Sequence, residues 1–228
     1  MSKKVYLSPS DQKNNAYAYG NTTEAIQCGK IAEACKAALE RSGVEVMVGQ
    51  YDTMANRCAA SDAFGANLHV PIHTNAYNGK VSGTRMFCYE SNGEGYKACK
   101  AIFDVLAPYT PGTSENIKVN ADLYEVRVPA APTAYIEVDF HDVPSVAKWI
   151  VENTTEIGEA IAKGLCKYLG VKFVPAQTQK PAEEPKADTG DVLYRVQVGA
   201  FSVRANADRM LEKLKAAGFA GFVVKGSK

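Results

Sequence analysis

Two apolar runs in this sequence carry side chains that bind metal ions or move protons. Residues 68–76 read Leu-His-Val-Pro-Ile-His-Thr-Asn-Ala, so an apolar run ends at His73. Residues 134–140 read Ala-Tyr-Ile-Glu-Val-Asp-Phe and place Glu137 in a second run that ends in acids. Short apolar runs are typical of buried strands, and open α/β sheets bind ligands at the carboxyl ends of their strands. A strand-end histidine and a strand-end carboxylate together indicate a metal-dependent hydrolase.

Strands and helices alternate along the part of the chain that must position these side chains. This alternation predicts an α/β fold with a single mixed or mostly parallel sheet, flanked by helices on both faces. The predicted strands cover residues 4–7 and 44–48, a segment ending at residue 73, and residues 83–89, 124–128 and 134–140. The predicted helices run from residue 22 or 23 to Gly43, over 53–65 and 95–106, from Pro144, and over 154–169.

Residues 174–191 interrupt this alternation. They contain three prolines and no large apolar residue after Val174, which is typical of an extended linker. We therefore expect a catalytic domain over residues 1–173, a linker over 174–191 and a small βαβ half-domain over 192–228. The half-domain is too short to bury a stable core alone. Its predicted elements are a strand over 193–201, a helix over 206–217 and a strand over 219–224.

The segments at residues 7–11, 23–24, 72–76 and 136–140 together resemble the zinc-dependent N-acetylmuramoyl-L-alanine amidases of the Amidase_3 family. The resemblance covers about residues 4–170. In that family, zinc is held by a histidine after the first strand, a glutamate at the start of the first helix and a histidine ending the middle strand. The resemblance implies one zinc ion per chain, with His73 and Glu24 as ligands and Glu137 as the catalytic glutamate. Asn75 is expected to orient the substrate or the strand end.

The first ligand position departs from the family pattern. The family usually reads Asp-Pro-Gly-His-Gly, whereas residues 8–12 read Ser-Pro-Ser-Asp-Gln, so Asp11 occupies the position of the histidine. A carboxylate can bind zinc at about 2.0–2.2 Å. Two carboxylates and one imidazole would hold zinc more weakly or favour a harder ion. Asp11 as a direct ligand, Gln12 or another polar neighbour in its place, and a degenerate, metal-poor site all remain open.

Simpler structural roles compete with these assignments. His69 lies four residues before His73, about 13 Å away along a strand, so both cannot bind one metal and His69 is expected in the core. No serine or cysteine stands where it would form a nucleophilic pair with His141, which is expected to be structural. Glu24 could serve only as an acid that stabilises the start of a helix. Glu137 is costly to bury unless it has a partner or a function.

The C-terminal segment resembles a SPOR repeat, a small peptidoglycan-binding module. The string Val-Gln-Val-Gly-Ala-Phe-Ser over residues 196–202 carries the resemblance, and one βαβ half of the βαββαβ pattern is present. This segment is expected to hold the protein on glycan strands.

The composition argues against other partners. A formal net charge of +1 gives no basic surface for nucleic acid, and no apolar segment approaches the ~20 residues that span a membrane.

The six cysteines are scattered without Cys-x-x-Cys pairs, which predicts free and mostly buried thiols made in a reducing compartment. The N-terminal residues lack the apolar stretch of a signal peptide. We expect a protein that binds peptidoglycan and is made in the cytoplasm, then released by lysis or a holin-type route, as a phage endolysin is.

The sequence therefore predicts a peptidoglycan hydrolase that uses a metal-activated water to cleave the amide between N-acetylmuramic acid and L-alanine. Zinc would be held by His73, Glu24 and Asp11, weakly if Asp11 is a ligand, and Glu137 would move the proton of the water. Two alternatives remain open: a metal-poor, non-catalytic peptidoglycan-binding protein, and a metallopeptidase of another substrate class.

Overall fold

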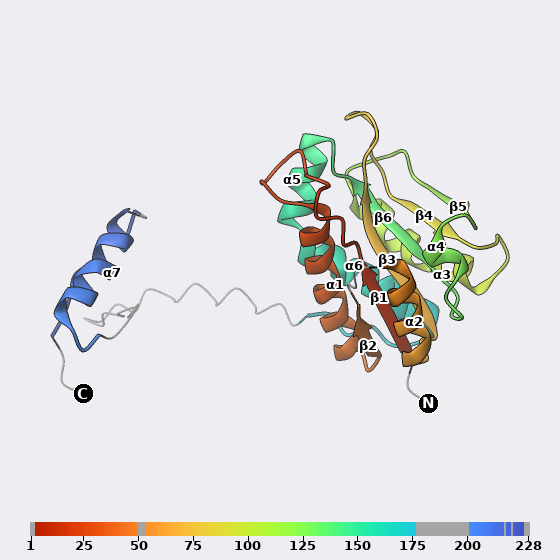
Figure 1. The fold of residues 1–228 in the computed structure, drawn as a ribbon, viewed down its shortest axis with the longest axis horizontal. Coiled ribbons are helices and arrows are strands. Elements are labelled where there is room, and N and C mark those ends of the chain that lie inside the picture. Colours follow the sequence, from red (N-terminus) through yellow and green to blue (C-terminus); the bar gives the residue numbers. More distant parts are fainter. Residues whose placement is uncertain (1–2, 50–52, 177–200, 217, 220, 226–228) are drawn as a thin grey trace, which may run out of the picture. The chain divides into compact units, whose positions relative to one another are not determined.

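The centre of the N-terminal unit is a sheet in which six strands of the described residues lie in the order β2-β1-β3-β6-β4-β5 (Figure 1). The computed structural model describes residues 3–49, 53–176, 201–216, 218–219 and 221–225. Contacts between residues divide the chain into two units, Met1–Gln177 and Thr178–Lys228. The strands are β1 (Lys4–Pro9), β2 (Glu45–Val48), β3 (Leu68–Asn75), β4 (Arg85–Cys88), β5 (Asn116–Val119) and β6 (Tyr135–Phe140).

Strand direction places the ends of β3 and β6 at the same edge of the sheet. The neighbours β2, β1, β3 and β6 are all parallel, whereas β4 runs antiparallel to β6, and β5 runs parallel to β4. The register of β3 and β6 pairs His73 directly with Glu137. The prediction of a single mixed α/β sheet is confirmed.

Helices cover both faces of the sheet, as predicted (Figure 1). On one face α6 packs against both α1 and α3, and on the other face α2 packs against β1 and α4. The helices of this unit are α1 (Glu24–Arg41), α2 (Met54–Phe64), α3 (Glu94–Leu106), α4 (Tyr124–Arg127), α5 (Pro144–Glu152) and α6 (Thr154–Leu169), with a short 3-10 helix η1 (Ala107–Tyr109).

Helix α6 approaches its two neighbours closely because glycines face them. A Cβ atom at Gly158 would lie 2.6 Å from the Cβ of Ala34 in α1, and one at Gly164 would lie 2.5 Å from the Cα of Ile102 in α3. Interiors as densely packed as this leave no room for a larger side chain. Helix α6 thereby fixes α1, which carries Glu24 in its first turn. The predicted apolar stripe of α6 supplies the fully buried residues Ile157, Ile161 and Leu165.

The predicted strand over residues 124–128 is wrong, because these residues form the helical turn α4. The backbone N–H of Val128 donates to the carbonyl of Tyr124 at 3.0 Å. The turn buries the adjacent residues Glu125 and Val126. A strand would direct these two side chains to opposite faces. Strand β5 lies earlier in the same region, and the sequence analysis does not predict it.

In the second unit, α7 (Arg204–Ala216) occupies the region of the predicted helix over 206–217. The predicted strand over 193–201 falls, except for Phe201, outside the described residues. Residues 219 and 221–224 form no strand, so the prediction of a strand over 219–224 is not met in the part of the segment that is described. A strand needs a paired neighbour, and the predicted partner is outside the described residues.

One prediction from composition, free and mostly buried cysteines, is confirmed by the structure. All six cysteines are buried and unpaired, as predicted. Among the residues that the structure describes, no helix combines the length and the apolar character needed to cross a membrane.

Candidate active site

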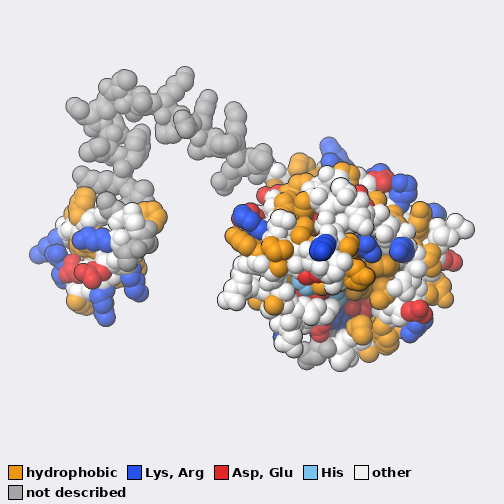
Figure 2. All heavy atoms as spheres, turned by 90° about the horizontal axis from the view of Figure 1, so that it is seen from above, with side chains coloured by type: hydrophobic (Ala, Val, Ile, Leu, Met, Phe, Trp, Pro, Cys, Tyr) orange, Lys and Arg blue, Asp and Glu red, His pale blue; other side chains and the backbone are white. Residues whose placement is uncertain are grey.

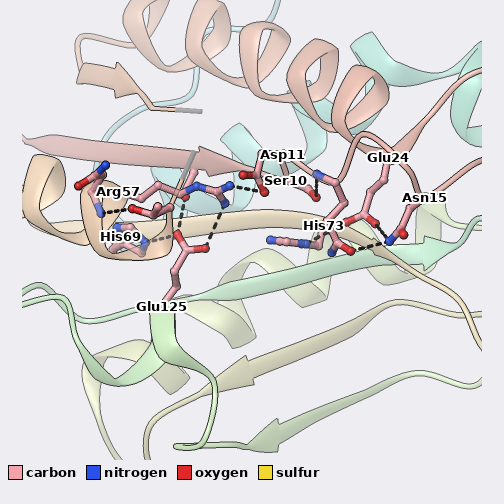
Figure 3. A network of polar contacts seen from close by, with 12 residues as sticks. Ser10, Asp11, Asn15, Glu24, Arg57, His69, His73 and Glu125 are labelled. Atoms are coloured by element: carbon pink, nitrogen blue, oxygen red, sulfur yellow. Dashed lines mark hydrogen bonds and ion pairs between the residues drawn. The ribbon is translucent and has the colours of Figure 1, made fainter. Parts of the chain in front are cut away.

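His73 and Glu24 meet where the end of β3 lies beside the first turn of α1 (Figure 3). His73 Nδ1 lies 2.9 Å from Glu24 Oε1. Only 9% of the His73 side chain and 1% of the Glu24 side chain are exposed. Burying a carboxylate without a partner costs free energy. Glu24 and His73 are therefore expected to pair with each other or to bind the same ion.

The pair favours opposite charges on its two members. Burial alone would raise the pKa of Glu24, but hydrogen bonds with His73 and Asn15 and the charge of His73 hold it below its usual value. Burial alone would lower the pKa of His73, but the hydrogen bond with Glu24 and the charges of Glu137 and Glu24 raise it. The negative charges of Glu24 and Glu137 that favour a proton on His73 would also attract a metal cation bound between His73 and Glu24.

The loop before α1 holds Glu24 in position. Asn15 Nδ2 donates to Glu24 Oε2 at 2.8 Å and to Gln12 Oε1 at 2.6 Å. The backbone N–H of Glu24 donates to the carbonyl of Asn15 at 2.9 Å, which satisfies one of the donors that a helix start leaves open. One carboxylate oxygen of Glu24 is therefore fixed by the loop, while the other faces His73. Asn15 is not among the residues predicted from the sequence, although a polar residue ahead of a helix start is a recognisable signal.

Glu137 lies beside His73 on the adjacent strand, because β3 and β6 pair these residues directly. Burial raises the pKa of Glu137 to about 7; the charge of His73 opposes the shift and that of Glu24 adds to it. Glu137 Oε2 and His73 Nε2 are buried and have no hydrogen-bond partner among the described residues. Buried polar atoms are nearly always satisfied, so two such atoms on paired residues indicate a place that receives a ligand.

Asp11 is not placed with His73 and Glu24. Its Oδ1 lies 2.5 Å from Arg57 Nη2, and Figure 3 shows its carboxylate turned toward that guanidinium. Within the described ranges, no group of three or more His, Cys, Asp or Glu side chains is arranged to hold a metal ion. The structure therefore brings together two of the three predicted ligands.

Arg57 belongs to a buried network that the sequence analysis does not find. Arg57 Nη1 donates to Glu125 Oε2 at 3.3 Å, Ser8 Oγ donates to Glu125 Oε1 at 2.5 Å, and His69 Nε2 lies 3.2 Å from the same oxygen. Burial alone would raise the pKa of Glu125, but hydrogen bonds from His69 and Ser8 and the charges of His69 and Arg57 hold it below its usual value. The sequences of α2 and α4 give no local sign that Arg57 and Glu125 are buried, because only contacts with distant parts of the chain bury them.

A cleft of about 460 Å³ opens beside His73. Its walls carry the charged side chains of Asp11 and Arg57 and the rings of Tyr124 and Tyr135. The ring of Tyr135 stacks on His73, with centroids 4.9 Å apart. Figure 2 shows histidine and acidic atoms inside a hollow on the surface of this unit. The cleft gives an extended polar molecule access to His73.

The remaining candidates have structural contacts. Asn75 ends β3, and its Oδ1 accepts a hydrogen bond from the next backbone N–H at 2.9 Å, so its role toward a substrate stays a prediction. His69 is fully buried, as expected of a core residue. His141 is also buried, and its Nδ1 lies 2.9 Å from Thr74 Oγ1, one residue beyond His73.

The chemistry of the Glu24–His73 pair fits zinc as two of its donors. An imidazole nitrogen and a carboxylate oxygen are both common zinc ligands, and adjacent donors around tetrahedral zinc lie about 3.3 Å apart for bonds of about 2.0–2.1 Å. The observed separation of 2.9 Å needs only a small widening to reach that value.

Comparisons with known proteins agree with this fold. Among curated relatives, the sporulation-specific N-acetylmuramoyl-L-alanine amidase of Bacillus subtilis (strain 168) is 25% identical over 228 residues, covering 97% of this chain and 84% of the relative. The N-acetylmuramoyl-L-alanine amidase CwlM of Bacillus licheniformis shows the same identity and coverage.

Solved structures share the fold. The N-acetylmuramoyl-L-alanine amidase from Clostridium difficile 630 superposes with a TM-score of 0.67 at 20% identity, covering 74% of this chain and 97% of that one. The catalytic domain of CwlV from Bacillus (Paenibacillus) polymyxa var. colistinus gives 0.66 at 19% identity, covering 75% and 99%. Residues 162–225 match the SPOR domain. Residues 8–167 match Amidase_3, and the chain therefore belongs to this family of N-acetylmuramoyl-L-alanine amidases.

Proposed function

We propose that this protein acts on the bacterial cell wall and hydrolyses the amide bond between the lactyl group of N-acetylmuramic acid and L-alanine in peptidoglycan. Membership of Amidase_3 supports the reaction class. The observation that carries the proposal is the buried Glu24–His73 pair near the carboxyl end of β3, beside Glu137 of the adjacent strand β6.

The cofactor of this reaction is one zinc ion per chain, with His73 and Glu24 as donors. When bound, zinc supplies a Lewis acid that polarises the scissile carbonyl and makes water more acidic. Asn15 fixes the second oxygen of Glu24 at 2.8 Å, and hydrogen bonds of this kind orient metal ligands.

Glu137 is the group that moves the proton. A carboxyl group with a pKa of about 7 can take a proton from the attacking water and return it to the leaving amine near neutral pH. Glu137 Oε2 has no hydrogen-bond partner among the described residues, so no contact there competes with this role. Asn75, two residues beyond His73 at the end of β3, orients the substrate.

The C-terminal unit keeps the enzyme on its insoluble substrate. The SPOR match over residues 162–225 supports peptidoglycan binding. We assign catalysis to residues 1–173, a linker to 174–191 and the binding repeat to 192–228. Val174, the first residue of this linker, lies within the first unit, where its backbone N–H donates to Ser42 Oγ at 3.0 Å. The part of the linker that acts as a tether therefore begins after Val174.

One observation favours a second candidate function. Among the described side chains, His73 and Glu24 have no third His, Cys, Asp or Glu arranged with them to hold a metal. A protein that holds no metal could still use the cleft and the C-terminal unit to bind peptidoglycan without cleaving it. Turnover separates the two functions.

The test is to incubate the zinc-loaded full chain with purified peptidoglycan and to identify the products by mass spectrometry. The proposal expects new amino groups on L-alanine, matched by free lactyl carboxylates on N-acetylmuramic acid. Binding to sacculi without these products would support the non-catalytic function, and cleavage at another bond would assign a different hydrolase activity.

A further inference from the structure

We infer that Asp11 is the counter-ion of the buried Arg57 and not a zinc ligand, so that His73 and Glu24 are the two protein donors to the metal (Figure 3). This inference rests on the proposed function, because it assigns roles around the same site. It departs from the family pattern, in which the position of Asp11 holds the first ligand.

The anchoring of Arg57 is the first observation behind this inference. The Arg57 side chain is 1% exposed, and its partner Glu125 is 2% exposed. Glu125 is itself held by Ser8 Oγ at 2.5 Å and by His69 Nε2 at 3.2 Å. Contacts from β1, β3 and α4 therefore fix the guanidinium in one place, and it cannot follow Asp11 toward the metal site.

The charge balance around Arg57 is the second observation. A buried guanidinium needs carboxylates close by, because removing one partner of a buried ion pair leaves an uncompensated charge. The contact of Arg57 with Asp11, 2.5 Å between Nη2 and Oδ1, is shorter than its 3.3 Å contact with Glu125. If the Asp11 carboxylate moved onto a metal ion, its contact with Arg57 would break. The Glu24–His73 pair, by contrast, is already formed while Asp11 stays on Arg57.

The Asp11–Arg57 ion pair lies in the wall of the cleft that leads to His73. Asp11, Arg57 and His73 all line the same cleft of about 460 Å³. With Asp11 held in the wall by Arg57, the cleft beside His73 stays open to water and substrate. A site with two protein donors holds zinc less tightly than one with three.

The experiment measures the zinc affinity of the metal-stripped full chain, by competition with a chromophoric chelator and without substrate. The variants are Asp11→Ala and Asp11→Asn, where the amide keeps the shape and a hydrogen bond to Arg57. His73→Ala is the positive control. Asp104→Ala is the matched control, because Asp104 pairs with Lys100 and Lys167 on the surface.

We expect both Asp11 variants to bind zinc within about threefold of the wild type, and His73→Ala to bind at least about 100-fold more weakly. Asp11→Ala should also lower the urea midpoint of unfolding, and Asp11→Asn should lower it less. If Asp11→Ala fails to fold, Asp11→Asn alone decides. A loss of about 100-fold or more in zinc affinity for a folded Asp11 variant, as large as that in His73→Ala, would make Asp11 a ligand and overturn the inference, because residues that only orient ligands cost less than this.

A wild-type chain that takes up no stoichiometric zinc would overturn it as well, since two donors would not suffice. The proposed function fails by a different result. A chain that binds zinc as expected but releases no L-alanine amino groups from peptidoglycan would leave the ligand assignment intact and remove the amidase activity.

Discussion

Glu24 and His73 lie 49 residues apart in the chain, yet Glu24 Oε1 and His73 Nδ1 are 2.9 Å apart. Strand β1 brings them together in space, because α1 follows β1 in the chain and β3 pairs with β1 in the sheet. Because Glu24 begins α1 and His73 lies near the end of β3, a small shift of α1 would separate the two donors. The close packing of α6 against α1 at Gly158 therefore supports the site from a distance.

Glu137 should be required for turnover but not for metal binding. In Glu137→Gln the side chain keeps its shape but can no longer accept the proton, so we expect the rate to fall about 100-fold or more. The measurement is the release of L-alanine amino groups from peptidoglycan, with zinc content determined in parallel. Glu45→Gln is the matched control, since Glu45 pairs with Lys4 at the surface. Near-normal rates in Glu137→Gln would remove this residue from the mechanism.

The residues beyond the first unit should contribute to retention and not to chemistry. A chain of residues 1–176 keeps Val174 and its contact with Ser42, and it should cleave a small soluble muramyl peptide as fast as the full chain does. It should wash off intact sacculi more readily, because a tethered binding module raises the local concentration of the enzyme. Equal sedimentation of both forms with sacculi would show that the tail adds no wall binding.

The buried Glu125 should make the stability of the protein sensitive to acid. Its pKa lies below the usual value in the folded state, so its contribution is complete above about pH 4.5 and is lost as the pH falls through the folded pKa. Glu125→Gln should be less stable than the wild type at pH 7, by about 2 kcal/mol or more. This difference should narrow below about pH 4.5, in urea unfolding followed at several pH values. A constant difference from pH 7 to pH 3.5 would contradict the ionised state that we assign to Glu125.

Much of the fold follows from local patterns in the sequence. Helix α6 has the predicted bounds, because its apolar stripe and the glycine at residue 170 are both local signals. Helix α2 begins after Thr53, whose Oγ1 accepts a hydrogen bond from the N–H of Asn56, and ends at Gly65 in a left-handed conformation. The abrupt end of an apolar run marks His73 as a candidate, and a place within another apolar run marks Glu137.

The parts that the sequence did not predict depend on contacts between distant residues. The segment from Tyr124 to Val128 alternates as a strand does, but Ser8, Arg57 and His69 gather around Glu125, and this favours a helical turn. The environment of Asp11 depends on Arg57, which comes from a different element. The spacing of residues 8–12 predicts which position aligns with a family ligand, and it carries no information on that ion pair.

The most direct test of the central claim is metal removal and restoration in the wild-type chain. We predict that stripping zinc with a chelator abolishes the release of L-alanine amino groups from purified peptidoglycan, and that one equivalent of zinc per chain restores it. The same treatment should restore nothing in His73→Ala. Full turnover by a chain that elemental analysis shows to be free of zinc and other divalent metals would contradict the claim that His73 and Glu24 form a catalytic metal site.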